Sequence, residues 1–267
     1  MTWEHFAEHR DRICTEVGGW TLNGRATLHG YDIHNQLTPE SAWMRTMILA
    51  VTGRLYPENA TRLVEAMHVA TGYPDPRIWC NRVVALAGTA RCSGSASISA
   101  GIASADGKIY GGQSEYQAAK TIEKAHCVLK EEGDTSLRAY IEGLLKQHRL
   151  VHGFGRPLAT VEERIAPVEA VAQRLGIEVG PHLATARRIG QILKKWRLIM
   201  NFGGYVSARL LDFCFSPIEV YRVLSIGFYI GLLPCYIEAF ENEPGTFLPI
   251  ACEDILYEGV PEREVPE

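Results

Sequence analysis

The sequence lacks the features that mark a secreted or nucleic-acid-binding protein. It has no block of Lys or Arg, and its formal net charge of -4 over 267 residues gives no general surface for polyanions, so no nucleic-acid partner is expected. Its seven cysteines form no CxxC pair, which predicts reduced thiols and a cytoplasmic location. The first residues, MTWEHFAEHRDRIC, are charged and contain no apolar core, so we expect no signal peptide there.

Long uninterrupted apolar runs are also scarce. The longest, about residues 223–240, is broken by Gly227, Gly231 and Pro234 and is short for a membrane span of about 20 residues. We interpret it as a buried helix that Pro234 kinks, with a membrane span as the alternative. No HExxH, zinc-finger or P-loop pattern occurs, so the sequence predicts neither a metal site nor a covalently bound cofactor.

Helical periodicity dominates what is present, and it predicts an all-α fold. The expected helices span residues 41–55, 57–72, 77–90, 114–132, 135–148, 161–175, 182–199, 205–213 and 217–241. The apolar positions that we expect to face inward near the N-terminus are Trp43, Met47, Ile48 and Val51 in the first of these helices, Leu63, Met67 and Ala70 in the second, and Trp79, Val83, Leu86 and Ala87 in the third.

Residues 92–107, CSGSASISAGIASADG, are small at nearly every position. The regular Ala and Ile positions favour a helix that a neighbouring backbone can approach closely, at the centre of the molecule or at a subunit contact. A flexible Ser/Gly linker is the alternative. Strand signals are weak, and only residues 20–29 suggest a short hairpin.

Two glycine-rich turns are candidates for ligand binding. Gly111-Gly112 precedes a predicted helix, whose first backbone N–H groups suit an anionic or thioester oxygen. A plain tight turn explains the pair equally well. The second turn, Gly153-Phe154-Gly155, is too short for a dinucleotide-binding fingerprint, and no strand is predicted before it.

The order of several blocks resembles the citrate synthase superfamily. The blocks are GRATLHGYDIHNQL with TGRLYP, NRVVALAGTARCSGSASISAGIASADGKIYGGQSE, VHGFGRPLATVEERI, NFGGYVSARLLDFCFSP and VLSIGFYIGLLPCYIEAF. They cover about residues 20–260, and the "GW-T…GYDI" opening looks closest to citrate synthase-like and citryl-CoA lyase members.

This resemblance implies an all-helical homodimer with a large and a small domain and a cleft between them. The domains would be residues 1–112 with 217–267, and residues 113–216. Members of the family bind a CoA thioester and a carboxylic acid and join or split them at a carbon–carbon bond. Two histidines polarise the reacting carbonyls, and an aspartate removes the α-proton.

The sequence departs from the family at each of these catalytic positions. Tyr110 stands where one histidine precedes Gly-Gly, Arg156 where the other follows Gly-Phe-Gly, and Gly203 where the aspartate is expected. Phe228 falls on a family arginine, whereas Arg164 retains an acid-binding one. The glycine scaffolds persist while the reacting side chains are exchanged for other functional ones, which favours repurposing over decay.

Carbon–carbon condensation needs a base for the α-proton and a donor at the enolate oxygen, and several residues are candidates. A phenol such as Tyr110 can donate, and His152 is a possible base. Arg156 and Arg164 could clamp an anion, or form salt bridges with the neighbouring glutamates. Glu115 is better explained by helix-start electrostatics. The predicted catalytic residues are Tyr110, His152 and Arg156, and the predicted substrate-binding residues are Arg164, Gly111, Gly112, Gly155 and Gly203.

Three functions remain open from the sequence. The first is an acyltransferase or lyase acting on an acyl-CoA or other acyl thioester, without ordinary citrate synthesis, in a specialised biosynthetic pathway. The second is a non-catalytic homologue that binds a CoA-like ligand or a partner. The third is a thioester hydrolase or decarboxylase. In each case we expect a small-molecule acid or thioester as ligand and no membrane association.

Overall fold

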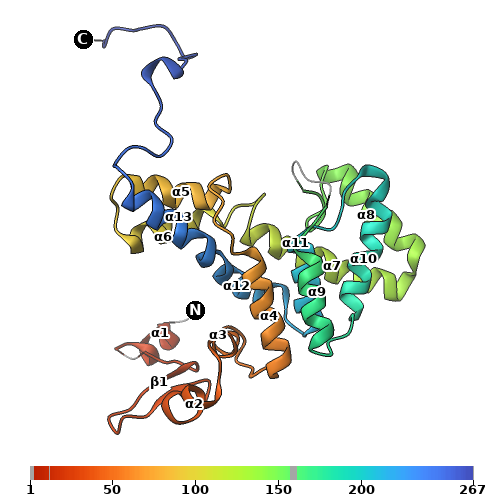
Figure 1. The fold of residues 1–267 in the computed structure, drawn as a ribbon. Coiled ribbons are helices and arrows are strands. Elements are labelled where there is room, and N and C mark those ends of the chain that lie inside the picture. The colour runs from red at the N-terminus through yellow and green to blue at the C-terminus, as the bar shows by residue number, and fades with distance from the viewer. Residues whose placement is uncertain (1–2, 12, 157–160, 267) are drawn as a thin grey trace. The chain divides into compact units, whose positions relative to one another are not determined.

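The structure is a computed structural model that describes residues 3–11, 13–156 and 161–266, and it is predominantly helical (Figure 1). The all-α class predicted from the sequence is confirmed. The contacts divide the chain into two compact units. Unit 1 comprises Met1–Tyr73 and Ala105–Ile230, and unit 2 comprises Pro74–Ser104 and Gly231–Glu267.

A small antiparallel sheet forms near the N-terminus of unit 1. Strand β1 (Gly18–Trp20) pairs with β2 (Ala26–Leu28), which confirms the predicted hairpin, and β2 also pairs with β3 (Tyr31–Asp32). The carboxylate of Asp32 then accepts the backbone N–H groups that begin the next helical turn. This capping explains why the chain changes from strand to helix directly after β3.

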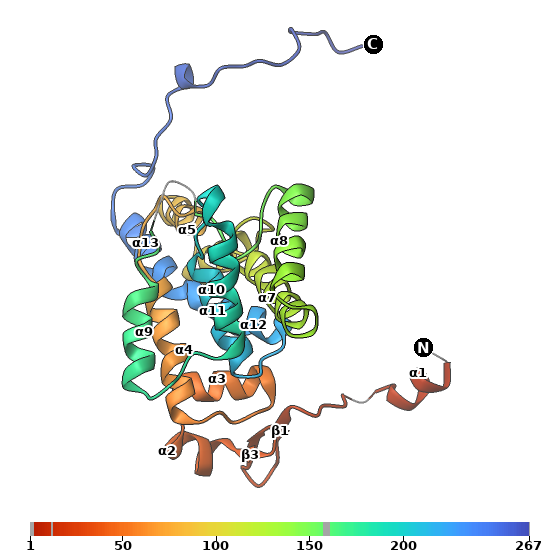
Figure 2. The ribbon, with the colours of Figure 1, turned by 90° about the vertical axis from the view of Figure 1, so that its right-hand side faces the viewer.

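The helices of unit 1 form one apolar core, in which α7 packs against α8, α10, α11 and α12 (Figure 2). Burial of side chains such as Ile122, Leu183 and Phe202 stabilises the unit by about 1.5–3 kcal/mol each. In chain order the helices of this unit are α1 (Trp3–His9), η1 (Ile33–Leu37), α2 (Thr38–Glu40), α3 (Trp43–Thr52), α4 (Glu58–Thr71), α7 (Gly112–Glu132), α8 (Asp134–His148), α9 (Ile165–Arg174), α10 (Pro181–Leu193), η2 (Lys194–Trp196), α11 (Phe202–Asp212), α12 (Pro217–Leu224) and η3 (Ser225–Phe228).

Side chains set the starts of the helices that frame this core. At α12, Ser216 and Glu219 form a capping box, and Pro217 occupies the first turn, where a missing N–H has no cost. At α10, the carboxylate of Asp212 accepts the N–H groups of His182 and Leu183 at 2.7 and 3.2 Å. These contacts satisfy backbone donors that the helices themselves leave unpaired.

Unit 2 contains α5 (Trp79–Thr89), α6 (Gly94–Ser104), most of α13 (Tyr229–Glu241) and the short turn η4 (Cys252–Asp254). The small-residue segment forms α6, so the helix prediction is confirmed and the linker alternative is wrong. A Cβ added to Gly101 would lie 2.5 Å from Val84 on α5, which explains the small residues by close helix packing.

The predicted single helix over residues 217–241 is interrupted by the 3-10 turn η3, and α13 continues through Pro234. By length and composition this stretch, Pro217–Glu241, could cross a membrane, with 39% of its most apolar window buried. Core helices of soluble proteins meet the same criterion.

The predicted buried face is wrong for α5 and wrong at one position for α3. In α5, Trp79 is 52% exposed and Leu86 is also exposed, whereas the smaller Cys80 is buried. In α3, Ile48 is buried as predicted, but Trp43 is 63% exposed and the next residue, Met44, is buried in its place. In α5 the reason is the close approach of neighbouring helices, which selects small side chains over large ones on the buried face.

The compact units do not follow the predicted domain boundaries. The sequence placed α7 in a domain of residues 113–216 and α12 in a domain of residues 1–112 with 217–267, yet these two helices pack against each other within unit 1. The division into a large and a small domain at those residues stays a prediction.

Replacing glycine by alanine in two helices tests the close packing of unit 2. At Gly88 in α5 an added Cβ would lie 2.7 Å from the backbone oxygen of Tyr236, so Gly88→Ala is expected to lower the free energy of unfolding by about 1–3 kcal/mol. At the exposed Gly143 in α8 nothing lies within 4 Å, and Gly143→Ala should raise it by about 0.5–1 kcal/mol. Urea denaturation of both variants measures the difference, and equal effects would contradict the packing described.

Candidate functional site

A tight turn brings the chain from unit 2 into the start of α7. Gly111 has a φ of 76°, and a Cβ there would lie 1.8 Å from the carbonyl oxygen of Ala105. That same oxygen accepts the N–H of Gly112 at 3.0 Å. The structure therefore supports the tight-turn interpretation of the glycine pair, because one of its amides is already hydrogen-bonded within the chain.

Tyr110 directly precedes this turn. Its side chain is partly buried, and its ring centroid lies 6.4 Å from that of Phe228, with the planes tilted by 52°. Both residues stand where the resemblance placed a polar family residue. Two positions that the sequence resemblance singles out therefore lie in aromatic contact, while their correspondence to polar family residues stays a prediction.

The loop of residues 151–156 carries three predicted site residues and is hydrogen-bonded to the start of α11. Asn201 donates from its side-chain amide to the carbonyl of Gly155 at 2.9 Å and from its backbone N–H to Gly153 at 3.0 Å. Gly153 and Gly155 have φ values of 84° and 92°, a conformation that favours glycine. These bonds fix the positions of the flanking His152 and Arg156.

The backbones of Gly153 and Gly204 approach each other closely. A Cβ on Gly204 would lie 2.2 Å from the carbonyl oxygen of Gly153, and a Cβ on Gly153 would lie 2.9 Å from the Cα of Gly204. Any side chain at either position would therefore separate the loop from α11. The pair of glycines, rather than either one alone, permits the observed geometry.

His152 faces the first turn of α7. Its Nδ1 lies 3.5 Å from the hydroxyl of Ser114. Burial lowers the pKa of His152, and the nearby His148 lowers the pKa further. The imidazole is therefore neutral at neutral pH and can accept a proton.

Glu115 follows on the same turn and lies beside Gly203. A Cβ on Gly203 would be 3.4 Å from Cγ and 3.9 Å from Oε1 of Glu115. Glu115 as a whole is only partly buried, but its Oε2 is inaccessible to solvent and has no hydrogen-bond partner in the described part of the chain. Burial raises the pKa of Glu115 to about 7, although the charge of Arg164 opposes the shift.

Arg164 is held by a buried carboxylate. Its guanidinium donates to both oxygens of Glu162, at 2.7 and 2.8 Å, and lies 4.8 Å from the ring centre of Phe202. Glu162 is only 3% exposed, and it also accepts the backbone N–H of Phe202 at 3.0 Å, at the start of α11. Glu162 is thus both an ion-pair partner and a helix cap.

Arg156 is paired as well, but at a more open position. It donates to both carboxylate oxygens of Glu163 and to the carbonyl of Val161, the latter at 2.9 Å. Glu163 is 58% exposed, and the pairing lowers its pKa to about 2. The salt-bridge alternative therefore describes both arginines in this structure, and the anion clamp stays a prediction.

The first turn of α7 is where the candidate residues come together. The Tyr110–Gly112 turn leads into it, the His152–Arg156 loop contacts it through Ser114, and Gly203 contacts it through Glu115. Sequence reasoning missed how the carboxylate of Glu115 is placed. Its position after a glycine pair pointed to it, but its burial depends on α11, which is distant in sequence.

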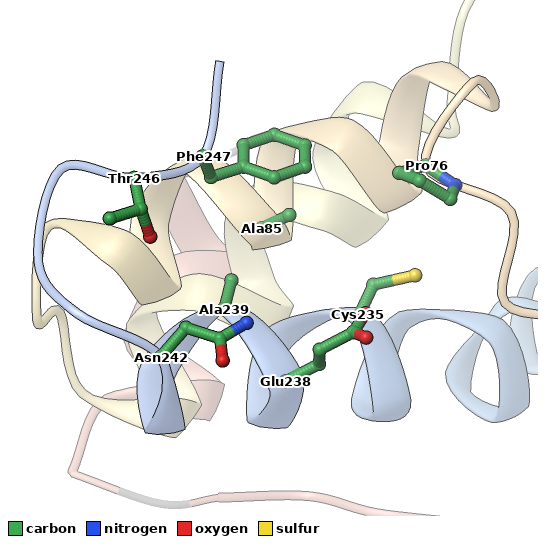
Figure 3. Close-up of a pocket in the computed structure, with 8 residues that line it drawn as sticks. All are labelled: Pro76, Ala85, Cys235, Glu238, Ala239, Asn242, Thr246 and Phe247. Atoms are coloured by element: carbon green, nitrogen blue, oxygen red, sulfur yellow. The ribbon is translucent and has the colours of Figure 1, made fainter. Parts of the chain in front are cut away.

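Two pockets elsewhere in the structure are lined by none of the predicted site residues. In unit 2 a cavity of about 90 Å³ is lined mainly by α13 and the segment after it (Figure 3). There Cys235 lies near Glu238, and burial raises the pKa of Cys235, so the thiol is not activated. In unit 1 a larger groove of about 660 Å³ lies between α4 and α9 and is largely apolar.

No set of three or more His, Cys, Asp or Glu side chains in the described residues could hold a metal ion. The nearest approach of histidines is a pair on α7 and α10, in which the rings of His126 and His182 are 4.6 Å apart. His126 contacts the hydroxyl of Thr185, and His182 contacts Asp212. These are polar contacts between helices.

Comparison with known proteins gives a fold and no sequence match. No protein-family model matches the chain, and no curated protein matches its sequence. Among solved structures, citryl-CoA lyase from Hydrogenobacter thermophilus has a TM-score of 0.81 and 19% identity, with 95% of this chain and 97% of that chain covered. ATP citrate lyase from Methanosaeta concilii in complex with (3S)-citryl-CoA has a TM-score of 0.74 and 16% identity, with 98% of this chain and 45% of that chain covered.

Citrate synthase from Thermoplasma acidophilum, in ternary complex with carboxymethyl coenzyme A and oxaloacetate, is also similar. Its TM-score is 0.63 and its identity 12%, over 85% of this chain and 60% of that chain. The protein thus has a citrate synthase-like fold, as the order of its sequence blocks predicted. At sequence identities below 20%, these comparisons show a shared fold alone.

The raised pKa of Glu115 predicts how stability depends on pH. A carboxyl whose pKa is about 7 in the folded state and 4.5 otherwise stabilises the fold fully below about pH 4.5, and this contribution is lost as the pH rises through 7. From about pH 4 to about pH 8 the protein should lose about 3 kcal/mol of unfolding free energy relative to Glu115→Gln. Urea denaturation across this range measures the loss.

Glu163→Gln is the matched control for that measurement. Because the pKa of Glu163 is lowered to about 2, its contribution is present above its ordinary pKa and is lost as the pH falls. The difference in unfolding free energy between wild type and this variant should therefore change little between pH 4.5 and 8, and it should shrink only as the pH falls below about 4.5. Parallel pH profiles for the two variants would show that Glu115 titrates as it does in water.

Proposed function

We propose that this protein is an enzyme acting on an acyl-CoA or other acyl thioester, forming or cleaving a carbon–carbon bond without ordinary citrate synthesis. The observation that carries this proposal is the meeting of three candidate segments at the first turn of α7, in a chain with a citrate synthase-like fold. Solved structures with this fold include a citryl-CoA lyase and a citrate synthase in complex with carboxymethyl coenzyme A and oxaloacetate.

Tyr110 would polarise the thioester carbonyl in this proposal. A phenol O–H donates well to a developing oxyanion, which is the most demanding requirement of an enolate-forming reaction. The N–H of Gly112 already donates to Ala105, so the side chain rather than this amide would supply the hydrogen bond. Gly111 and Gly112 would hold the ring of Tyr110 in place through the tight turn.

His152 would carry a proton during the second half of the reaction. Its lowered pKa keeps the imidazole neutral at neutral pH, so it can accept a proton and return it. The loop of residues 151–156 is hydrogen-bonded to Asn201 and holds His152 next to Ser114, in the first turn of α7 that follows Tyr110. A neutral histidine in a fixed orientation is suited to general acid–base work.

The two arginines would contribute in different ways to binding the anionic part of the substrate. Arg156 is hydrogen-bonded to the exposed Glu163 and lies farther, at 3.8 Å, from the buried Glu162, so a substrate carboxylate can replace Glu163 with little desolvation. Arg164 is bound by the buried Glu162, whose removal would leave an unpaired buried charge. Arg156 is therefore the better candidate for direct contact, and Arg164 for positioning.

Thiol release from a panel of acyl-CoAs tests this function. Tyr110→Phe is expected to lower the rate about 10²–10³-fold, because it removes one donor to the oxyanion. Tyr140→Phe, which removes a hydroxyl from α8, is the control and should leave the rate unchanged. Stabilisation by CoA without turnover would favour a non-catalytic homologue, and release without a carbon acceptor would favour a hydrolase or decarboxylase.

We also propose that the protein is a cytoplasmic homodimer. Large apolar side chains on α5 and α13 are exposed in the single chain, among them Trp79, Leu233 and Ile237. Exposed apolar surfaces of this kind are common where chains associate. Sedimentation equilibrium should give a dimer for the wild type and a monomer for Ile237→Asp; a monomeric wild type would contradict the proposal.

A further inference from the structure

Glu115 differs from every other carboxylate that the site gathers. Glu162 also contacts the start of α11, but both of its oxygens accept hydrogen bonds, from the guanidinium of Arg164 and from the N–H of Phe202. The Oε2 of Glu115 is inaccessible to solvent and finds no hydrogen-bond partner in the residues described. A buried acid without a partner lowers stability, and such groups are concentrated at functional sites.

The residue beside Glu115 on α11 offers its carboxylate no side-chain partner. Gly203, across from its carboxylate, presents no side chain, and its backbone does not require glycine for a left-handed conformation. The charged and titratable groups near it are Arg164 at the start of α9, with its partner Glu162, and His152 beyond Ser114. These groups lie on two segments, the start of α9 and the loop of residues 151–156.

We propose that Glu115 is the base that removes the α-proton of the bound thioester, at the place that Gly203 leaves without a side chain. This inference depends on the proposed function and names the proton acceptor of that site. In the step, the α C–H bond breaks and the proton joins a carboxylate oxygen of Glu115. The electron pair moves into the new carbon–carbon double bond, and the thioester oxygen takes up the negative charge opposite Tyr110.

The chemistry of the neighbouring groups supports this assignment. Arg156 is a permanent cation and cannot accept a proton, and Gly203 has no side chain to do so. A carboxyl with a pKa near 7 is ionised in part at neutral pH, and it is a much stronger base there than an exposed carboxylate. His152 is then free to serve the second carbonyl, so each proton transfer has its own group.

Hydrogen exchange at the α-carbon isolates this step. Acetyl-CoA is incubated with the protein in D2O, and incorporation of deuterium into the acetyl group is followed by mass spectrometry. The wild type should catalyse exchange with a rate that rises as the pH passes through about 7, as the carboxylate of Glu115 forms. Glu115→Gln should lower the rate about 10²–10⁴-fold and abolish this pH dependence.

Two variants at Gly203 separate chemistry from structure. A Cβ there would meet Glu115 and Asn201 at 3.4 Å, an ordinary contact, so substitutions at 203 should be accommodated. Adding Gly203→Asp to Glu115→Gln returns a carboxylate to the same place and should restore part of the exchange. Gly203→Ala in the same background is the control and should restore none. Equal rates for these two double variants would overturn the assignment.

The binding of acetyl-CoA, measured by calorimetry, distinguishes failure of this inference from failure of the proposed function. Unchanged affinity with lost exchange in Glu115→Gln supports the assignment. Exchange that is equally fast in Glu115→Gln overturns the role of Glu115 and leaves the thioester function intact. Binding without exchange in the wild type also overturns that role. Absence of both binding and thiol release for every acyl-CoA tested overturns the proposed function, and this inference with it.

Discussion

The contact between the backbones of Gly153 and Gly204 is the constraint on which the candidate site depends. With no side chain at either residue, the loop that carries His152 and Arg156 lies directly on the start of α11. The same part of α11 presents Gly203 to α7. One close approach of two backbones therefore brings both His152 and Gly203 to the first turn of α7.

The charges around this contact fall into two classes with opposite physical roles. In the pairs of Arg164 with Glu162 and Arg156 with Glu163, the carboxylates are hydrogen-bonded to the guanidinium groups. The buried Glu162 also caps α11. These pairs fix the positions of the surrounding chain. Glu115 has no hydrogen-bond partner for its Oε2, and burial keeps its pKa far above that of Glu163. A site needs both classes, because rigid pairs hold the geometry while an unsatisfied group can respond to a ligand.

The class of fold and most elements could be predicted from periodicity, turn residues and the order of the sequence blocks, because those signals are local. The buried face of α5 and the exposure of Trp43 in α3 could not be predicted, since packing partners decide which side of an apolar helix turns inward. The environment of Glu115 could not be predicted from the sequence either. Its position suggested helix-start electrostatics, whereas Gly203, far along the chain, determines what lies opposite its carboxylate.

The space at residue 203 has an evolutionary consequence. A glycine codon becomes an aspartate codon by one nucleotide change, and at 203, unlike 153 or 204, neither the backbone angle nor a neighbouring backbone forbids the side chain. An aspartate there would stand beside Glu115, and the two carboxylates would share a proton rather than both ionise. A descendant could thus exchange one acid for the other through a protonated pair, and the helices would keep their packing at every stage.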